Sequence, residues 1–146
     1  MGEEQSSATK TLDILLDSTL DSVDSAESLV LKLAREVGFD DDDLHDLGMA
    51  VREAMVNAVV HGNRYNLNKK VHLSVAKETD RLSVRITDEG EGFEHAGLPD
   101  PLAEENLLRQ SGRGLLLIQA FVDEFHMGRV PPLGTEVKMV KVRKTN

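Results

Sequence analysis

The chain has 146 residues, contains no cysteine and carries a formal net charge of −9 at pH 7. This length suits a single domain with a real core, and the lack of cysteine excludes disulfides and thiolate metal sites. The acidic balance argues against a surface for nucleic acid or anionic membranes, because either would need a basic patch. The longest apolar run, GLLLIQAFV, is far too short to cross a bilayer, and we expect a cytoplasmic protein.

The first half of the chain predicts one strand followed by two helices. Residues 1–8 are expected to form a flexible tail, and residues 9–17 alternate as an edge strand does. Leucine and valine recur at helical spacing over residues 21–37, after which Gly38 supplies a stop. A second helix is predicted from the N-cap Asp40 to Gly62, with further aspartates at the positive end of its dipole. Its expected core stripe is apolar and consists of Leu44, Leu47, Val51, Ala54 and Ala58.

The second half predicts a hairpin, a long loop, a helix and a final strand. Residues 70–78 and 81–89 alternate on either side of a short turn, residues 114–125 read as a helix, and residues 134–143 read as a strand. The loop between them is long and weakly patterned, and we expect a mobile lid over about 94–111.

This order of elements defines the expected fold class. Neighbouring strands without intervening helices favour an α+β fold, a two-layer α/β sandwich whose mostly antiparallel mixed sheet is covered on one face by about three helices. Residues 9–146 are predicted to form one domain.

The stretch REAMVNAVVHGN places polar residues on an otherwise apolar helix. Glu53, Asn57 and His61 recur at four-residue steps. Each step turns a helix by only about 40°, so the three side chains form one narrow stripe. A helix that is apolar on its other sides is expected to be buried. Taken singly, Asn or Glu in such a helix is more often a hydrogen-bonded or salt-bridged structural residue than a ligand.

Two glycine-bearing motifs flank the long loop. DEGEGF (residues 88–93) directly follows a predicted strand, and SGRGLLL (residues 111–117) directly precedes a predicted helix. Alone, the first is usually a turn with positive φ angles, and the second can reflect tight helix packing. Free backbone N–H groups at a helix N-terminus also suit a phosphate.

Together, the polar stripe and the two motifs supply the parts of a magnesium–nucleotide site. An Asp at a strand end can accept a hydrogen bond from an exocyclic amine, and an Asn oxygen can ligate Mg²⁺. A carboxylate one helical turn away can orient or deprotonate a nucleophile. The Walker A sequence with its lysine does not occur in the chain, so a nucleotide site of another kind is predicted.

The motifs occur in an order that resembles a known family. Glu53-x-x-x-Asn57-Ala58, Asp88-x-Gly90-x-Gly92, Gly112-x-Gly114-Leu115 and Gly134-Thr135 resemble the ATP-binding superfamily of histidine kinases, heat-shock chaperones, type II topoisomerases and mismatch-repair ATPases. Within it, the short length and the stretch REAMVNAVVHGN are most similar to the anti-sigma-factor serine kinases of bacteria. The resemblance runs from Thr9 to Arg143, nearly the whole chain.

The resemblance implies a role for each motif residue. Asn57 would ligate Mg²⁺ at the phosphates of ATP, Glu53 would be the general base, and Asp88 would bind the adenine amino group. His61 aligns with a ligand-side position, for which a plain helix-end histidine is an equal alternative. The other implied residues shape the adenine pocket or lie near the phosphates or the adenine: Gly90, Gly92, Gly112, Arg113, Gly114, Leu115 and Thr135.

The resemblance also implies a protein-serine kinase that holds a sigma factor and phosphorylates a serine of a small antagonist protein. The family often forms homodimers, and the oligomeric state of this chain is left open. Gln110 stands where related kinases often carry Arg, which leaves open whether Arg109 or Arg113 meets the phosphates. The alternative is a nucleotide-dependent binding switch with little or no transfer, acting on a partner other than a sigma factor. A self-contained histidine kinase is disfavoured, because the helix over residues 21–37 has no phosphoacceptor histidine.

Overall fold

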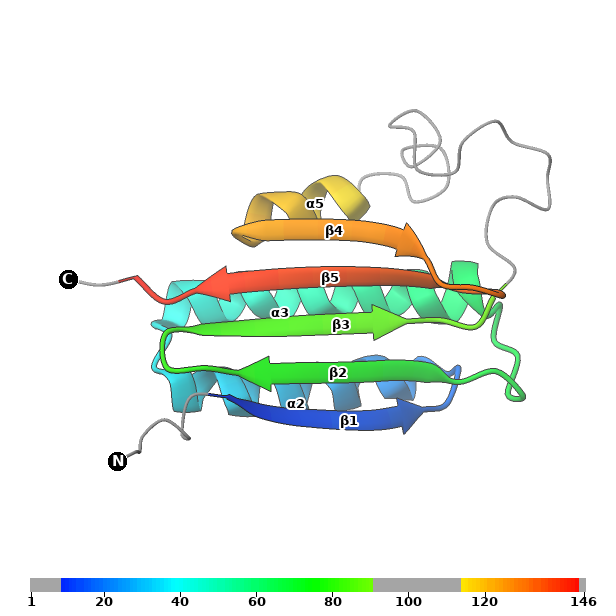
Figure 1. Ribbon diagram of the computed structural model, residues 1–146, viewed down its shortest axis with the longest axis horizontal. Helices are drawn as coiled ribbons and strands as arrows, with labels where there is room; N and C mark the ends of the chain where they lie inside the picture. Colours follow the sequence, from blue (N-terminus) through cyan, green and yellow to red (C-terminus); the bar gives the residue numbers. More distant parts are fainter. Residues whose placement is uncertain (1–8, 91–113, 145–146) are drawn as a thin grey trace.

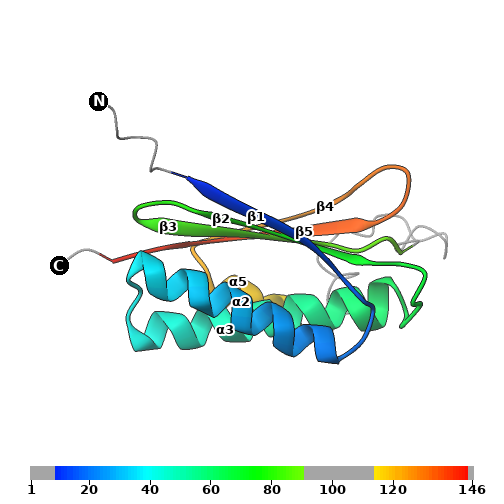
Figure 2. The same cartoon turned by 90° about the horizontal axis from the view of Figure 1, so that it is seen from below.

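The computed structural model describes residues 9–90 and 114–144, which form one sheet with helices packed on one face (Figures 1 and 2). The strands are β1 (Lys10–Leu16), β2 (Val71–Lys77), β3 (Arg81–Thr87), β4 (Glu124–Arg129) and β5 (Thr135–Val142). They lie in the order β1-β2-β3-β5-β4. Each neighbouring pair is antiparallel, so the predicted α+β sandwich is confirmed, but over the described residues its sheet contains no parallel pair.

The helical layer is built around α3. The helices are α2 (Asp21–Val37), α3 (Asp41–Val56), a π-helical turn η1 (Asn57–Gly62) that continues α3, and α5 (Gly114–Phe121). Both α2 and α5 contact α3, which places α3 in the middle of the layer (Figure 1). Arg52 of α3 donates to Asp24 and Glu27 of α2 at 2.8 and 2.7 Å, and these bonds fix the two helices side by side.

The predicted N-cap of this central helix is confirmed. The backbone N–H of Asp43 donates to the Asp40 carboxylate at 2.8 Å, which satisfies one of the free N–H groups of the first turn. Gly38, in a left-handed conformation with φ of 100°, ends α2 as predicted.

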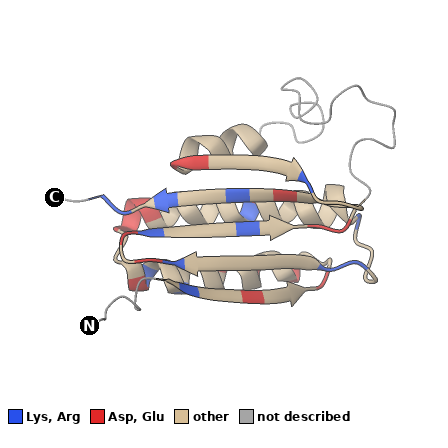
Figure 3. Ribbon diagram, in the orientation of Figure 1, with Lys and Arg blue, Asp and Glu red and all other residues tan. Residues whose placement is uncertain are grey.

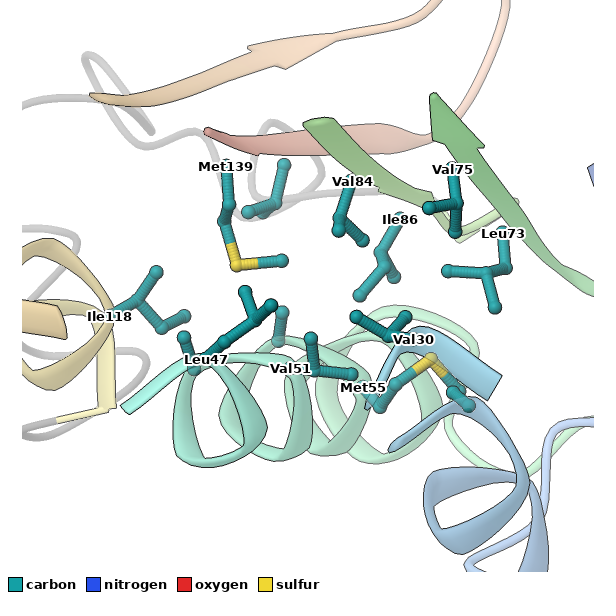
Figure 4. Packing of buried hydrophobic residues seen from close by; sticks show 14 of the residues in the cluster. Val30, Leu47, Val51, Met55, Leu73, Val75, Val84, Ile86, Ile118 and Met139 are labelled. Atoms are coloured by element: carbon teal, nitrogen blue, oxygen red, sulfur yellow. The ribbon is translucent and has the colours of Figure 1, made fainter. Parts of the chain in front are cut away.

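The core lies between the sheet and the helices. Val71, Leu73 and Val75 alternate with less buried residues along β2, as expected of a sheet with one covered face. The core stripe predicted for α3 is buried except at Leu44, which is only partly covered. The largest buried side chains meet in a single cluster (Figure 4): Leu47, Met55, Leu73, Leu82, Ile86, Leu115, Ile118 and Met139.

The prediction of a helix through residues 114–125 is wrong at its C-terminal end. The helix stops at Phe121, and Glu124 begins β4, a strand that the sequence analysis did not identify. At Asp123 the chain is already hydrogen-bonded to β5, because the Asp123 N–H donates to the carbonyl of Val140 at 2.8 Å. The alternation of inward Phe125 and Met127 was hidden, since Phe125 follows Phe121 by four residues and so fits the helical spacing of the preceding apolar run.

Charged residues of both signs are interspersed over the strands and the helix ends (Figure 3). Within residues 9–90 and 114–144, no helix combines the length and apolarity needed to cross a membrane. The expected tail over residues 1–8 and the expected lid over 94–111 lie outside the described residues.

Replacing Asp40 with Ala removes the side-chain acceptor of the α3 N-terminus and is expected to lower the free energy of unfolding by about 1 kcal/mol. Asp40→Asn is the matched control, because Asn caps a helix about as well as Asp does. Urea denaturation of both variants measures the difference. Equal losses in both would show that the charge of Asp40, and not the cap, stabilises α3.

Candidate functional site

A pocket opens between the C-terminal part of α3, the turn η1 and the covered face of the sheet. The space between its walls measures about 470 Å³, part of which is open to solvent. Its lining comes from α3, η1, α5 and the strands β3, β4 and β5 with their ends, and consists of Ala54, Asn57, Ala58, His61, Gly62, Ile86, Asp88, Leu115, Met127, Thr135 and Val137.

The predicted polar stripe borders this pocket. Glu53 and Asn57 are half-buried, whereas their neighbours Ala54 and Ala58 are buried in the core. His61 is exposed and lies at the pocket wall. The stripe therefore faces a hollow at the edge of the core and is not packed into the core itself.

The side-chain amide of Asn57 is the unexplained polar group of the pocket. Its Nδ2 is buried and has no hydrogen-bond partner in the described part of the chain. Buried polar groups in proteins are nearly always hydrogen-bonded, and a group without a partner calls for an explanation. A ligand in the pocket would supply the missing partner. Since the two ends of an amide are assigned by their surroundings, the oxygen could face that ligand equally well.

Helix α5 begins directly against the stripe. A Cβ atom added at Gly114 would lie 2.8 Å from Oε1 of Glu53 and 3.8 Å from Nδ2 of Asn57. The N-terminus of α5, whose first N–H groups lack helical partners, is thus adjacent to both polar side chains. Leu115, the next residue, is 2% exposed and lines the pocket.

Asp88 lies across the pocket from the stripe, at the end of β3. Its Oδ1 accepts hydrogen bonds from the backbone N–H groups of Gly90 at 2.9 Å and Thr135 at 3.2 Å. Neither bond uses Oδ2, which lies over Gly62. Burial raises the pKa of the Asp88 carboxyl, and the two backbone N–H groups offset part of that rise.

The turn that follows Asp88 rests directly on the backbone of η1. A Cβ atom at Gly62 would overlap the Asp88 carboxylate, and one at Gly90 would overlap the carbonyl of Gly62. Glycine is required at both positions, because the Asp88 side chain lies against Gly62 and the backbone of Gly62 lies against Gly90. The sequence analysis gave Gly62 only the role of ending the helix.

The apolar walls of the pocket were not predicted. Ile86 and Val137 are inward-facing residues of β3 and β5, and the alternation of these strands could have indicated them. Met127 could not have been found without β4, the unpredicted strand. Together these side chains give the pocket a largely apolar interior suited to a flat, uncharged ring.

The residues around Asn57 fit a magnesium ion held together with phosphates. Within residues 9–90 and 114–144, no group of three or more His, Asp or Glu side chains could hold a metal by itself. Mg²⁺ does not need such a group, because it retains waters and commonly takes one or two protein oxygens plus phosphate oxygens. The half-buried Asn57 amide provides one such oxygen.

Several predicted site residues cannot be placed. Gly92, Gly112 and Arg113 lie outside the described residues, as do Arg109 and Gln110. The described structure brings the other predicted residues together in or beside the pocket: Glu53, Asn57, His61, Asp88, Gly90, Gly114, Leu115 and Thr135.

The sequence pattern of the family described as "Histidine kinase-like ATPase domain" matches residues 16–141. The chain belongs to this family. Within it, the chain is 33% identical over 103 residues to an anti-sigma F factor of Bacillus subtilis, which covers 68% of the chain and 70% of that protein. It is also 33% identical over 98 residues to the serine-protein kinase RsbW of Bacillus subtilis, with 63% of the chain and 61% of the relative covered. These matches place it with the anti-sigma-factor serine kinases, as the motifs indicated.

A solved structure has the same fold. The crystal structure of the RsbU and RsbW domains of a Mycobacterium tuberculosis protein superposes with a TM-score of 0.65, over 94% of this chain, at 20% sequence identity. The chain spans only 35% of that larger protein.

The buried carboxylate of Asp88 is expected to reduce the stability of the ligand-free protein. Asp88→Asn should raise the melting temperature at pH 7, since an amide oxygen can accept the same N–H bonds without burying a charge. The pKa of the Asp88 carboxyl is higher in the folded protein than its ordinary value of 3.8. The protonated carboxyl therefore stabilises the fold fully below pH 3.8, and this stabilisation is lost as the pH rises through the folded-state pKa. The difference between the two proteins should therefore shrink as the pH falls.

Thermal melts of the ligand-free native protein and Asp88→Asn between pH 4.5 and pH 7 check this sign. A native protein that is the more stable at pH 7 would show that the Asp88 carboxylate stabilises the fold and is not held there for a ligand.

Proposed function

We propose that the protein is an ATP-dependent serine-protein kinase that also acts as an anti-sigma factor, holding a sigma factor and phosphorylating a serine of a small antagonist protein. The observation that carries this proposal is the unpartnered, buried amide of Asn57 beside the Glu53 carboxylate, both next to the N-terminus of α5. A purely structural pair would be hydrogen-bonded to its surroundings, whereas a pair that serves a nucleotide would not be.

The proposed orientation of ATP follows from the two ends of the pocket. The adenine ring would lie against Met127, Ile86 and Val137, with its amino group donating to Asp88. Its phosphates would extend toward Asn57 and the N–H groups that begin α5. Asn57 would hold Mg²⁺, which when bound neutralises negative charge on the phosphates.

Glu53 is positioned to act on the incoming serine. Its carboxylate would accept the hydroxyl proton as the serine oxygen forms a bond to the γ-phosphorus and the bond from that phosphorus to the bridging oxygen of ADP breaks. A general base is needed for this transfer and not for nucleotide binding alone. Its place beside Gly114 supports the kinase over a nucleotide-dependent binding switch.

The partners are proposed from the relatives. Proteins that match this chain are named anti-sigma F factor and serine-protein kinase, and the first name states the kind of protein that is held. A homodimer and a cytoplasmic location remain part of the same proposal. The binding switch, acting on a different partner, would be correct if nucleotide binds normally and no phosphate is transferred.

Glu53 and Asn57 are expected to have separable roles. Glu53→Gln keeps the size and hydrogen bonding of the side chain, so ATP affinity should stay near native while phosphate transfer falls by about 10²- to 10⁴-fold. Asn57→Ala removes the oxygen proposed for Mg²⁺, so Mg-ATP affinity itself should fall. Calorimetric titration with Mg-ATP and a transfer assay with labelled ATP measure the two effects.

Glu36→Gln is the matched control for the glutamate, because Glu36 is exposed at the far end of α2 and pairs with Lys77. It should transfer phosphate at the native rate. Native transfer by Glu53→Gln would remove the general base from the proposal, and a thermal melt separates that result from loss of folding.

Adenine recognition is tested at Asp88. Asp88→Asn exchanges one acceptor oxygen for a donor facing the amino group, so ATP affinity should fall at least tenfold, about 1.4 kcal/mol. Asp80→Asn, in the turn between β2 and β3, carries the same chemical change away from the pocket and should bind as the native protein does. Unchanged ATP affinity in Asp88→Asn would exclude Asp88 from the adenine site.

A further inference from the structure

Asn63, the residue after the π-helical turn, is buried and fully hydrogen-bonded at the junction of three chain segments. It is 2% exposed. Its Oδ1 accepts from the backbone N–H of Glu89 at 2.8 Å. Its Nδ2 donates to Oγ of Ser18 at 2.9 Å and to the carbonyl of Lys70 at 3.0 Å. The proposed function gives no role to this residue, although it closes the stretch REAMVNAVVHGN.

The partners of Asn63 determine which side chain can occupy this position. The oxygen must face an N–H group, and the nitrogen must face a carbonyl, so one orientation of the amide satisfies both. A carboxylate here would place an oxygen against the carbonyl of Lys70. The site therefore requires an amide of this length.

Glu89 completes the connection from the opposite side. Its carboxylate accepts from the backbone N–H of Lys70 at 3.0 Å and contacts Nε2 of His72 at 2.6 Å. The pKa of the Glu89 carboxyl is lowered, chiefly by the bond with His72. Asn63 and Glu89, which we call the Asn63–Glu89 clamp, thus join the end of η1, the start of β2 and the turn after β3.

The clamp acts on the turn that carries Asp88. Glu89 is the next residue along the chain, and Gly90 rests directly on the carbonyl of Gly62, the residue before Asn63. Because glycine backbone meets glycine backbone at this contact, no side chain can adjust if the turn moves. Thr135 ties Asp88 to β5 through two hydrogen bonds, and the clamp adds the bonds that tie the Asp88 turn to η1 and to the start of β2.

We infer that Asn63 and Glu89 are positioning residues that set the selectivity for the 6-amino group of adenine by fixing the Asp88 turn on η1. This inference rests on the proposed ATP site. A hydrogen bond weakens steeply with distance and angle, so a small displacement of Asp88 would remove its preference for an amine without closing the pocket. The clamp would then affect recognition of the amine much more than binding of the rest of the nucleotide.

The test compares two nucleotides with isolated, full-length protein. One is ATP, and the other is purine riboside triphosphate, which is ATP without the 6-amino group. The native protein is expected to bind ATP about tenfold more tightly or better, the usual worth of such a bond. In Asn63→Ala the ATP affinity should fall, and the affinity for the analogue should stay within about twofold of native. The ratio of the ATP affinity to the analogue affinity should therefore fall at least about fivefold.

Two further variants keep the test decisive. Ser18→Ala removes a different hydrogen bond of Asn63 and leaves its bonds to residues 70 and 89 in place, so the melting temperature should fall and the ratio should stay native. Glu89→Ala removes the acceptor of the Lys70 N–H at a partly exposed site, so the fold should survive and the ratio should fall about two- to fivefold. Glu89→Ala decides the matter if Asn63→Ala does not fold.

The outcomes separate the two levels of the proposal. If Asn63→Ala and Glu89→Ala fold and keep the native ratio of ATP to analogue affinity, or lose affinity for both nucleotides equally, the positioning role is overturned. The proposed ATP site would remain intact. Failure of the native protein to bind either nucleotide would overturn the proposed function and the inference with it.

Discussion

The direct contact between the backbone at Gly62 and the turn Asp88–Gly90 connects the two layers of this fold at the place where the pocket lies. Elsewhere the sheet and the helices meet through apolar side chains, which can adjust to one another. Here a Cβ atom on either glycine would overlap the opposite segment. The contact between Gly62 and the turn therefore limits where Asp88 can lie relative to Asn57 and Glu53.

The central helix α3 carries polar side chains at the edge of the hydrophobic core, while its other sides remain packed in that core. Packing of α3 between α2, α5 and the sheet buries its apolar sides. Of the polar stripe, Asn57 and His61 line the pocket, and Glu53 lies beside the first residue of α5. At the pocket this arrangement has a cost in two groups, the amide of Asn57 without a partner and the desolvated carboxylate of Asp88. Proteins commonly accept such local instability where a ligand is bound.

Much of this arrangement could be read from the sequence, because the patterns were strong where a single face is buried. The cap at Asp40, the stop at Gly38 and the hairpin of β2 and β3 follow from local rules. Strand β4 was missed, because Phe125 lies at helical spacing from Phe121 in the preceding apolar run, and pairing with β5 overrides that local preference. The junction at Asn63 could not be predicted either, since its partners Ser18, Lys70 and Glu89 come together only in the folded chain. The roles of Gly92, Gly112 and Arg113 stay predictions from the motifs.

The most direct test of the pocket as a phosphotransfer site uses the protein that co-purifies with this chain from its own cells. The purified pair is incubated with ATP labelled at the γ-phosphate, with and without Mg²⁺, and the modified residue is identified by mass spectrometry. The kinase proposal predicts label on a serine of the partner, only when Mg²⁺ is present. Tight Mg-ATP binding without transfer, or an acid-labile label on a histidine, would contradict it.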